Sequence, residues 1–165
     1  MDVRGVIVVD TSVAVEALVA EAPCHEGYAN LLAAIRKQGV MLAYCELLEA
    51  ELVEAAYTWD IRRRYPRDWR ARRRAQTLHR LEARERRILP AWRALAGENQ
   101  SIVVPVRAVI DTSVDFVTDR GLGSYDAVHL ATAFRLRAPI LTHDRFMAQA
   151  AAPAIKVVTL REDVV

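Results

Sequence analysis

Residues 5–12 read GVIVVDTS, a short run of β-branched apolar residues that ends in a polar cluster. Such a run is typical of a strand buried on both faces, and the polar residues predict that the strand ends at Asp10. Helical stretches follow at about 12–20 and 26–38, and Gly39 then precedes a second apolar strand at about 40–44. The chain therefore opens with the strand–helix–strand alternation that builds a parallel sheet.

The same alternation continues to the last residues. We expect a helix at about 46–59 and then an Arg-rich segment that Pro66 interrupts and that continues as one helix or a pair of helices to about 95, before Gly97 and Asn99. A strand at 102–106, a helix at 107–119 and a glycine turn should follow. The chain should then form a helix capped by Ser124 and running to about 135, a strand at 138–142, a short helix and a strand at 155–160. This order predicts an α/β fold, a three-layer α/β/α arrangement with a mostly parallel central sheet.

The length of 165 residues predicts one domain spanning 1–165, with the Arg-rich helical segment at about 60–96 as part of it. Hydrophobic residues make up 53% of the chain, which is enough for a core. No apolar run reaches the roughly 18 residues that a membrane span needs, and no signal peptide pattern begins the chain, so we expect a cytoplasmic protein without a membrane partner. Cys24 and Cys45 alone need not pair and cannot complete a zinc site.

The net charge of +2 conceals an uneven distribution of charge. Residues 62–93 contain thirteen arginines and three acidic residues, an excess of ten positive charges, so the rest of the chain carries minus eight. The planar guanidinium suits bidentate contact with phosphate, and RNA is therefore a candidate partner. The residues predicted to contact RNA are Arg62, Arg63, Arg64, Arg67, Arg70, Arg72, Arg73 and Arg74, with Tyr65, Trp69 and Trp92 as candidates for base stacking. The alternative is a solvated helical face with its Trp rings in a core.

Acidic residues stand at or near the ends of the predicted strands. Asp10 ends the first strand, Asp144 follows the strand at 138–142, Asp126 lies in the first turn of a helix, and Glu51 occupies an otherwise apolar helix face. In an open α/β sheet, ligands bind at the carboxyl ends of the strands, so we expect these four carboxylates to meet at one edge. Each residue alone also fits a turn, a helix cap or a solvated surface, and the inference depends on the set.

A carboxylate cluster of this kind suits Mg²⁺ or Mn²⁺, which prefer oxygen ligands and need only a few of them besides the phosphate oxygens of a substrate. Such a metal lowers the pKa of a bound water and neutralises the charge that develops on a scissile phosphate. The cluster therefore predicts hydrolysis of a phosphodiester bond with Mg²⁺ or Mn²⁺ as the cofactor.

Three motifs carry a resemblance to a known family: Asp10-Thr11-Ser12 after the opening strand, YDAVHLATA at 125–133 and LTHD at 141–144. The sequence resembles the PIN-domain nucleases and, within them, the VapC-like ribonuclease toxins of type II toxin–antitoxin pairs, nearly end to end. The resemblance implies that Asp10, Glu51, Asp126 and Asp144 ligate one or two divalent metals and are catalytic, and that Thr11, Ser12 and Thr142 support them by hydrogen bonds. It also implies a cognate antitoxin and a homodimer.

The glutamate of the second family motif has more than one candidate in the stretch CELLEAELVE at 45–54. Glu51 matches the Ala-Glu-Leu context of the family, and helical spacing places it with Leu47 and Ala55 toward the interior. Glu49 is the second candidate. The Arg-rich segment is longer and more basic than the resemblance leads us to expect.

Other residues carry less weight. A second Asp-Thr-Ser, at 111–113, falls in a predicted helix with no strand directly before it. His129 and His143 flank the predicted site, but a metal-activated water makes an imidazole base unnecessary. Two alternatives to a toxin remain: an RNA-processing or DNA-flap nuclease of the same fold without an antitoxin, and a non-catalytic nucleic-acid-binding module built on the arginines. Metal-dependent cleavage excludes the second.

Overall fold

The computed structural model of the chain describes residues 5–76, 83–151 and 153–160. Within these residues one sheet of five strands forms the centre, in the order β3-β2-β1-β4-β5, and every neighbouring pair is parallel. The strands are β1 (Val6–Val9), β2 (Met41–Cys45), β3 (Ile102–Val104), β4 (Ile140–Leu141) and β5 (Val157–Val158). The predicted parallel α/β sheet is confirmed, and β1 is its central strand.

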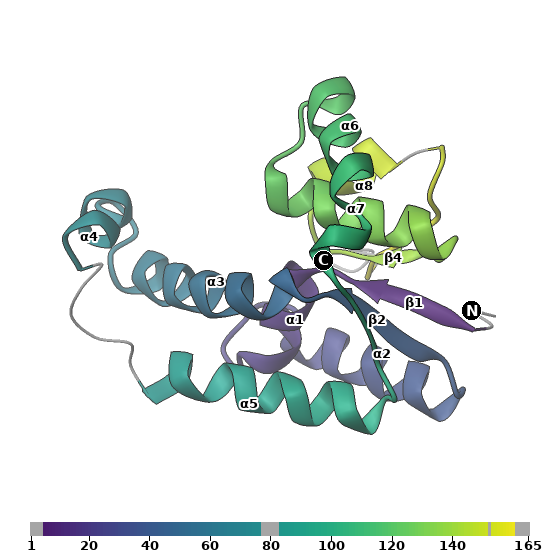
Figure 1. Cartoon of the computed structure of the whole chain (residues 1–165). Helices are drawn as coiled ribbons and strands as arrows, with labels where there is room; N and C mark the ends of the chain where they lie inside the picture. The colour runs from purple at the N-terminus through teal and green to yellow at the C-terminus, as the bar shows by residue number, and fades with distance from the viewer. Residues whose placement is uncertain (1–4, 77–82, 152, 161–165) are drawn as a thin grey trace.

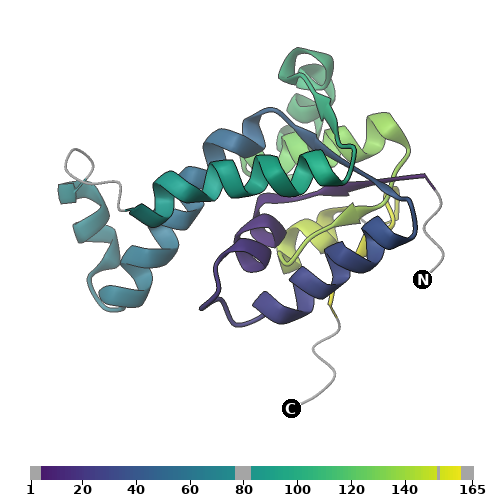
Figure 2. The same ribbon diagram turned by 90° about the horizontal axis from the view of Figure 1, so that it is seen from below.

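Helices cover both faces of the sheet (Figure 1). One face is covered by α1 (Thr11–Leu18), α2 (His25–Lys37), α3 (Leu47–Arg64) and α5 (Ala83–Glu98), and the other by α6 (Ile110–Arg120), α7 (Ser124–Leu136) and α8 (Arg145–Ala151). A short 3₁₀ helix, η1 (Val106–Ala108), precedes α6. The helix α4 (Trp69–Gln76) lies beyond the end of α3, away from the sheet. Seen from below, α3 and α5 lie side by side (Figure 2).

The strands divide the apolar side chains between two cores. Along β1, Ile7 and Val9 belong to the core under α1, α2, α3 and α5, whereas Val8 belongs to the core under α7. Successive side chains of a strand point to opposite faces, and this alternation produces the division. β1 is buried on both faces because it lies between two helical layers, as its continuous β-branched run predicts.

Some element boundaries differ from those predicted. The helix expected to end near residue 59 continues to Arg64, and Asp60 pairs there with Arg63 and Arg64 at three- and four-residue spacing, which supports the added turn. α5 continues through Gly97 to Glu98, where the side-chain amide of Asn99 bonds the carbonyl of Leu95.

The prediction that Ser124 caps a helix is wrong. Ser124 is the first residue of α7, and Gly123 occupies the cap position with extended backbone angles. Glycine is also accepted at this position, so the helix begins there without a side-chain cap.

The Arg-rich segment contains the end of α3 and, after Pro66, the helices α4 and α5, which agrees with the predicted pair of helices. Tyr65 ends α3 directly before Pro66, whose ring cannot continue a helix, and α4 begins at Trp69. Cys24 and Cys45 do not form a disulfide with each other. In the described part of the chain, no helix combines the length and the apolar character needed to cross a membrane.

Candidate metal-binding active site

Two of the four predicted carboxylates stand at the carboxyl ends of neighbouring strands. Val9 of β1 and Leu141 of β4 are partners in the sheet, and Asp10 follows the first directly while Asp144 follows the second after two residues. The hydroxyl of Thr142 donates a hydrogen bond of 2.7 Å to Oδ2 of Asp10. Parallel pairing of β1 with β4 therefore brings two distant segments together at one edge of the sheet.

Asp144 also has a local structural role. Its Oδ1 accepts a 2.9 Å hydrogen bond from the backbone N–H of Met147, which satisfies a free donor in the first turn of α8. Its own backbone N–H donates to Oγ1 of Thr142. These two hydrogen bonds fix the orientation of the Asp144 side chain.

Asp126 reaches the same edge from the first turn of α7. The positive end of the helix dipole favours a carboxylate there. A side chain at Gly123 would crowd it, because an added Cβ would lie 3.3 Å from Oδ2 of Asp126. The glycine before the helix thus leaves room for the carboxylate.

Glu51 comes from α3, the helix that follows β2. The hydroxyl of Thr11 donates a 2.5 Å hydrogen bond to its Oε2, and Nε2 of His129 lies 2.8 Å from the same oxygen. Glu49, the second candidate for this position, points elsewhere: it accepts hydrogen bonds from Arg93 and from the hydroxyl of Tyr44.

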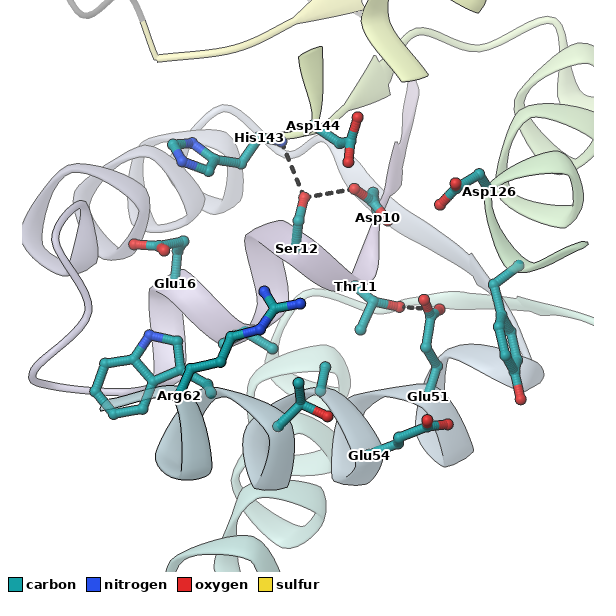
Figure 3. A pocket seen from close by; sticks show the side chains of 15 residues that line it. Asp10, Thr11, Ser12, Glu16, Glu51, Glu54, Arg62, Asp126, His143 and Asp144 are labelled. Carbon is teal, nitrogen blue, oxygen red and sulfur yellow. Dashed lines mark hydrogen bonds between the residues drawn. The ribbon is translucent and has the colours of Figure 1, made fainter. Parts of the chain in front are cut away.

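The four predicted carboxylates line one pocket and come from four separate segments of the chain (Figure 3). Burial raises the pKa of Asp126 from its ordinary value of 3.8 to about 6, and the charges of Asp10, Asp144 and Glu51 add to this, while His129 opposes it. Burial and repulsion from the neighbouring carboxylates therefore both favour the protonated form of Asp126.

His129 lies behind the carboxylates, fully buried in α7. Burial alone lowers the pKa of its imidazole, but the hydrogen bond to Glu51 and the charges of Asp10, Glu51 and Asp126 outweigh burial and raise it. Its Nε2 is 3.8 Å from Oδ1 of Asp10, and its Nδ1 has no hydrogen-bond partner among the residues that the structure describes. The imidazole therefore partly compensates the negative charge of Glu51 and Asp10.

The hydroxyl residues predicted to support the carboxylates make contacts with them. Besides the bonds of Thr11 and Thr142, Oγ of Ser12 donates a 2.5 Å hydrogen bond to Oδ2 of Asp10 and accepts one from the backbone N–H of His143. One oxygen of Asp10 is thus held by two hydroxyl groups, which fixes the orientation of the carboxylate.

The donor set has the chemistry that Mg²⁺ and Mn²⁺ prefer, since it consists of carboxylate oxygens in a partly open pocket. Within the described residues, no three His, Cys, Asp or Glu side chains already stand in an arrangement that would hold a metal ion. The carboxylates would have to move toward one another around a cation. Burial contributes most to the raised pKa of Asp126 and repulsion from the other three carboxylates adds to it; a divalent cation would relieve that repulsion.

The pocket contains residues that the sequence did not single out. Glu16 lines it, with a carboxylate that accepts a hydrogen bond from the backbone N–H of Cys24. Glu54 and Trp59 of α3 also line it. The spacing of Glu54 and Trp59 from Glu51, in steps of three and four residues, predicts that they lie near the same helix face. Spacing alone does not tell which side of that face lines a pocket and which side packs in a core.

The eight arginines predicted to bind RNA occupy different surroundings. Of the seven whose side chains the structure describes, only Arg62 lines the pocket. Arg63 and Arg64 pair with Asp60, and Arg73 pairs with Glu54. Several also lie over aromatic rings: Arg62 and Arg70 over Trp69, Arg63 over Trp59, and Arg72 over Tyr65. Arg67 is exposed, and the side chain of Arg74 is not among those that the structure describes.

The aromatic residues predicted to stack on bases are not all at the surface. Trp92 is fully buried in the core, where its ring meets that of Tyr44 at 5.2 Å, so it cannot stack on a base. The second Asp-Thr-Ser lies in the first turns of α6, as predicted, and its Ser113 bonds the carbonyl of Val109.

Comparisons with known proteins agree with this architecture. The profile of the PIN domain family matches residues 7–153. No curated protein sequence matches the chain. The solved structures that resemble it include VapBC2 from Rickettsia felis, bound to a DNA fragment from its promoter (13% identity, TM-score 0.59, 93% of this chain and 98% of that chain covered). They also include PAE2754 from Pyrobaculum aerophilum (21% identity, TM-score 0.53, 92% and 91% covered) and FitAcB from Neisseria gonorrhoeae (18% identity, TM-score 0.53, 92% and 95% covered). At these identities the structures bear on the fold alone.

Proposed function

Because the chain belongs to the PIN domain family, whose members are nucleases, we propose that it is an endoribonuclease that depends on Mg²⁺ or Mn²⁺. The observation that carries the proposal is the convergence of Asp10, Glu51, Asp126 and Asp144, from four separate segments, on one pocket. Four carboxylates in a shared site stabilise the fold poorly, since they repel one another. Such a cluster is accounted for by a cation that it binds.

In this proposal the four carboxylates hold the metal. A bound Mg²⁺ or Mn²⁺ would supply positive charge for the scissile phosphate and would lower the pKa of a water molecule. Ser12 and Thr142 hold Oδ2 of Asp10 by hydrogen bonds. Thr11 and His129 hold Oε2 of Glu51 in the same way. These bonds orient two carboxylates before any ligand arrives.

Asp126 has a further role in this proposal. With a pKa of about 6 it binds a proton in mildly acidic solution, when no cation compensates its neighbours. A ligand that needs the charged carboxylate must displace that proton, so binding weakens as the pH falls through about 6.

RNA is the proposed substrate class because of the Arg-rich segment. Residues 62–93 carry an excess of ten positive charges, and Arg62 brings one of them into the pocket itself. Lys and Arg side chains supply most of the affinity of a protein for a nucleic acid backbone. A positive segment beside an acidic pocket would hold a polyanion while a cation in the pocket engages one phosphate.

We further propose that the protein is the toxin of a toxin–antitoxin pair and has a cognate antitoxin as its partner. The motifs at 10–12, 125–133 and 141–144 support this through their resemblance to VapC-like toxins. The likeness to VapBC2 and FitAcB agrees with it at the level of the fold. A protein encoded beside this chain that binds it tightly and blocks cleavage would establish the pair.

The first experiment is cleavage of a mixed pool of single-stranded and structured RNA by the purified protein, with Mg²⁺, Mn²⁺ or EDTA. Asp10→Asn serves as the control, since it removes a ligand charge at nearly constant shape. We expect cleavage with metal, none with EDTA and none by the variant. Cleavage of DNA flaps in preference to RNA would favour the nuclease without an antitoxin. RNA binding without any cleavage, under every metal, would favour the non-catalytic module.

A further inference from the structure

The carboxylate cluster stands between two hollows rather than at the end of one. The pocket described above has a volume of about 420 Å³, and a second pocket of about 650 Å³ lies between the α6–α7 loop and α8. Both are lined by Asp126 and Asp144. Each volume falls in the range of sites that hold a small organic molecule, and a nucleotide is of that size. An endonuclease needs room for its substrate on both sides of the bond that it cuts.

The first hollow is lined by a stripe of α3 that leads away from the carboxylates. Glu51, Ala55, Thr58 and Arg62 follow one another at intervals of four, three and four residues, so they share one face of the helix. Trp59 lies beside this stripe, and its ring packs partly against the core. The far end of the hollow therefore offers an anchored aromatic ring and a cation.

Arg62 is suited to bind a phosphate. Its guanidinium points into the pocket, toward the region between Glu16 and Thr11 (Figure 3). Among the described residues it forms no ion pair, whereas Arg63 and Arg64 are committed to Asp60. Its guanidinium instead lies 4.2 Å from the ring centroid of Trp69. Stacking uses the flat face of the group and leaves the N–H edge for a phosphate.

The second hollow carries an aromatic ring that is exposed to solvent. Phe146 is 79% exposed, more than any other large apolar residue in the described part of the chain, and it lies two positions after Asp144. The hollow also contains Arg120, but that guanidinium bonds the carbonyl of Ala150. An exposed ring at the rim of a pocket that holds two of the carboxylates is a surface on which a base can stack.

We propose that the two hollows form one track for single-stranded RNA, with the scissile phosphate at the carboxylates. A nucleotide on one side stacks on Trp59 while Arg62 binds its phosphate, and a nucleotide on the other side stacks on Phe146. This inference rests on the proposed nuclease function and adds the substrate form that the site accepts. Bases must leave a duplex to stack in this way, so the track excludes double-stranded RNA. Stacking tolerates every base, so these two positions contribute little sequence preference.

The test uses the full-length protein and variants Trp59→Leu, Arg62→Gln and Phe146→Leu. Cleavage of a short single-stranded RNA is measured with Mn²⁺, and RNA affinity is measured with Ca²⁺ in its place. We expect each variant to raise KM and to weaken RNA binding by about tenfold, with a smaller change in kcat. Arg62→Gln should also reduce the slope of log affinity against log salt by about 0.7. Trp59→Phe keeps an aromatic ring and should bind better than Trp59→Leu.

Two matched controls lie outside both hollows. Arg135 is an exposed arginine of α7 outside the Arg-rich segment, and Phe134 is an exposed phenylalanine of α7 that packs against Phe116. Arg135→Gln and Phe134→Leu should leave KM and affinity near the wild-type values. Equal losses in the controls and the variants would overturn the track, because the effect would then be one of general charge or general apolar surface.

RNA with a single abasic nucleotide assigns each ring to one side of the cut. Removing the base on one side should weaken wild type and Phe146→Leu but not Trp59→Leu, and removing it on the other side should show the reverse. Variants that respond to both abasic RNAs as wild type does would overturn the track and leave the nuclease intact. Wild type that binds RNA through these residues in Ca²⁺ but never cleaves would overturn the proposed function and leave the track. Wild type that binds no single-stranded RNA would overturn the track.

Discussion

The hydroxyl of Thr142 donates a 2.7 Å hydrogen bond to Oδ2 of Asp10 and so connects two residues that lie 132 positions apart in sequence. The same hydroxyl oxygen accepts a hydrogen bond of 2.9 Å from the backbone N–H of Asp144. Thr142 is buried, so water cannot replace either bond. One side chain thereby sets the positions of two of the four carboxylates.

Thr142→Val is expected to weaken metal binding while preserving the fold. It removes both hydrogen bonds at constant shape, and loss of an outer partner of a metal ligand lowers affinity by about 10- to 100-fold. The free energy of unfolding should fall by about 1–3 kcal/mol, because buried polar groups lose a partner. Calorimetric titration with Mn²⁺ and urea unfolding measure the two effects. Thr142→Ser keeps the hydroxyl and should restore affinity; a serine variant as weak as the valine variant would contradict the explanation.

Asp126→Asn is expected to stabilise the metal-free protein at alkaline pH. Burial first, and then the charges of Asp10, Asp144 and Glu51, raise the pKa of Asp126 to about 6. A carboxyl group with a raised pKa contributes most to stability below its ordinary value of 3.8, where it is protonated in both states, and this contribution is lost as the pH rises through about 6. Asparagine has no charge to bury.

The difference between Asp126→Asn and wild type therefore depends on pH. After allowance for partial exposure of the side chain, we expect about 1 kcal/mol in favour of the variant at pH 8. The difference should shrink as the pH falls through 6 toward 4. Urea unfolding in EDTA at pH 4.5, 6 and 8 measures it. A difference that stays constant over this range would show that the Asp126 carboxylate is not strained by its neighbours.

His129→Leu is expected to destabilise the protein more at pH 6 than at pH 9. The raised pKa of His129 means that its contribution to stability is complete below its ordinary value of 6.5 and is lost as the pH rises through the folded-state value. Leucine leaves Glu51 and Asp10 without their buried cation, at a cost of about 3 kcal/mol at pH 6. Guanidinium unfolding at the two pH values distinguishes this from simple packing, which would cost the same at both.

Gly123→Ala is expected to lower metal affinity by about tenfold through crowding of the Asp126 carboxylate, since the added Cβ would lie 3.3 Å from Oδ2. Gly97→Ala is the matched control. An added Cβ at Gly97 would meet no atom within 4 Å, and the residue lies inside α5, so this substitution should raise stability by about 0.5–1 kcal/mol without a change in metal affinity. Equal Mn²⁺ affinities for the two variants would show that the site tolerates the methyl group.

The fold was predictable where local chemistry and burial agree. The β-branched run before Asp10 predicts a buried strand, and the structure places it at the centre of the sheet. The end of α3 was not predictable from composition, because it depends on the ion pairs of Asp60 with Arg63 and Arg64. The start of α7 was missed by one residue, since the sequence offers both Gly123 and Ser124 as caps.

The carboxylates of the candidate site were predictable for a different reason. Parallel strands end at one edge, so residues that follow strands are brought together whatever lies between them in sequence. Trp59 and Glu16 could not be predicted in this way. They line the pocket because α1 and α3 pack against each other, and that contact depends on the tertiary arrangement of both helices. The metal-binding and catalytic roles of the four carboxylates stay predictions, as do the RNA contacts of the arginines outside the pocket.

Asp10 follows the central strand with no residue between them, and this has a consequence for how the sequence can change. The side chains of β1 alternate between two filled cores, so the strand cannot slide along its neighbours by one residue without exchanging its two faces. The position of the Asp10 carboxylate therefore cannot be changed gradually, because a shift of the strand by one residue would move it by about 3.3 Å, the rise of one residue in a strand. Insertions and deletions in residues 6–10 should be lethal to folding and activity together. Lineages of this protein would have to vary specificity through α3 and α8 instead.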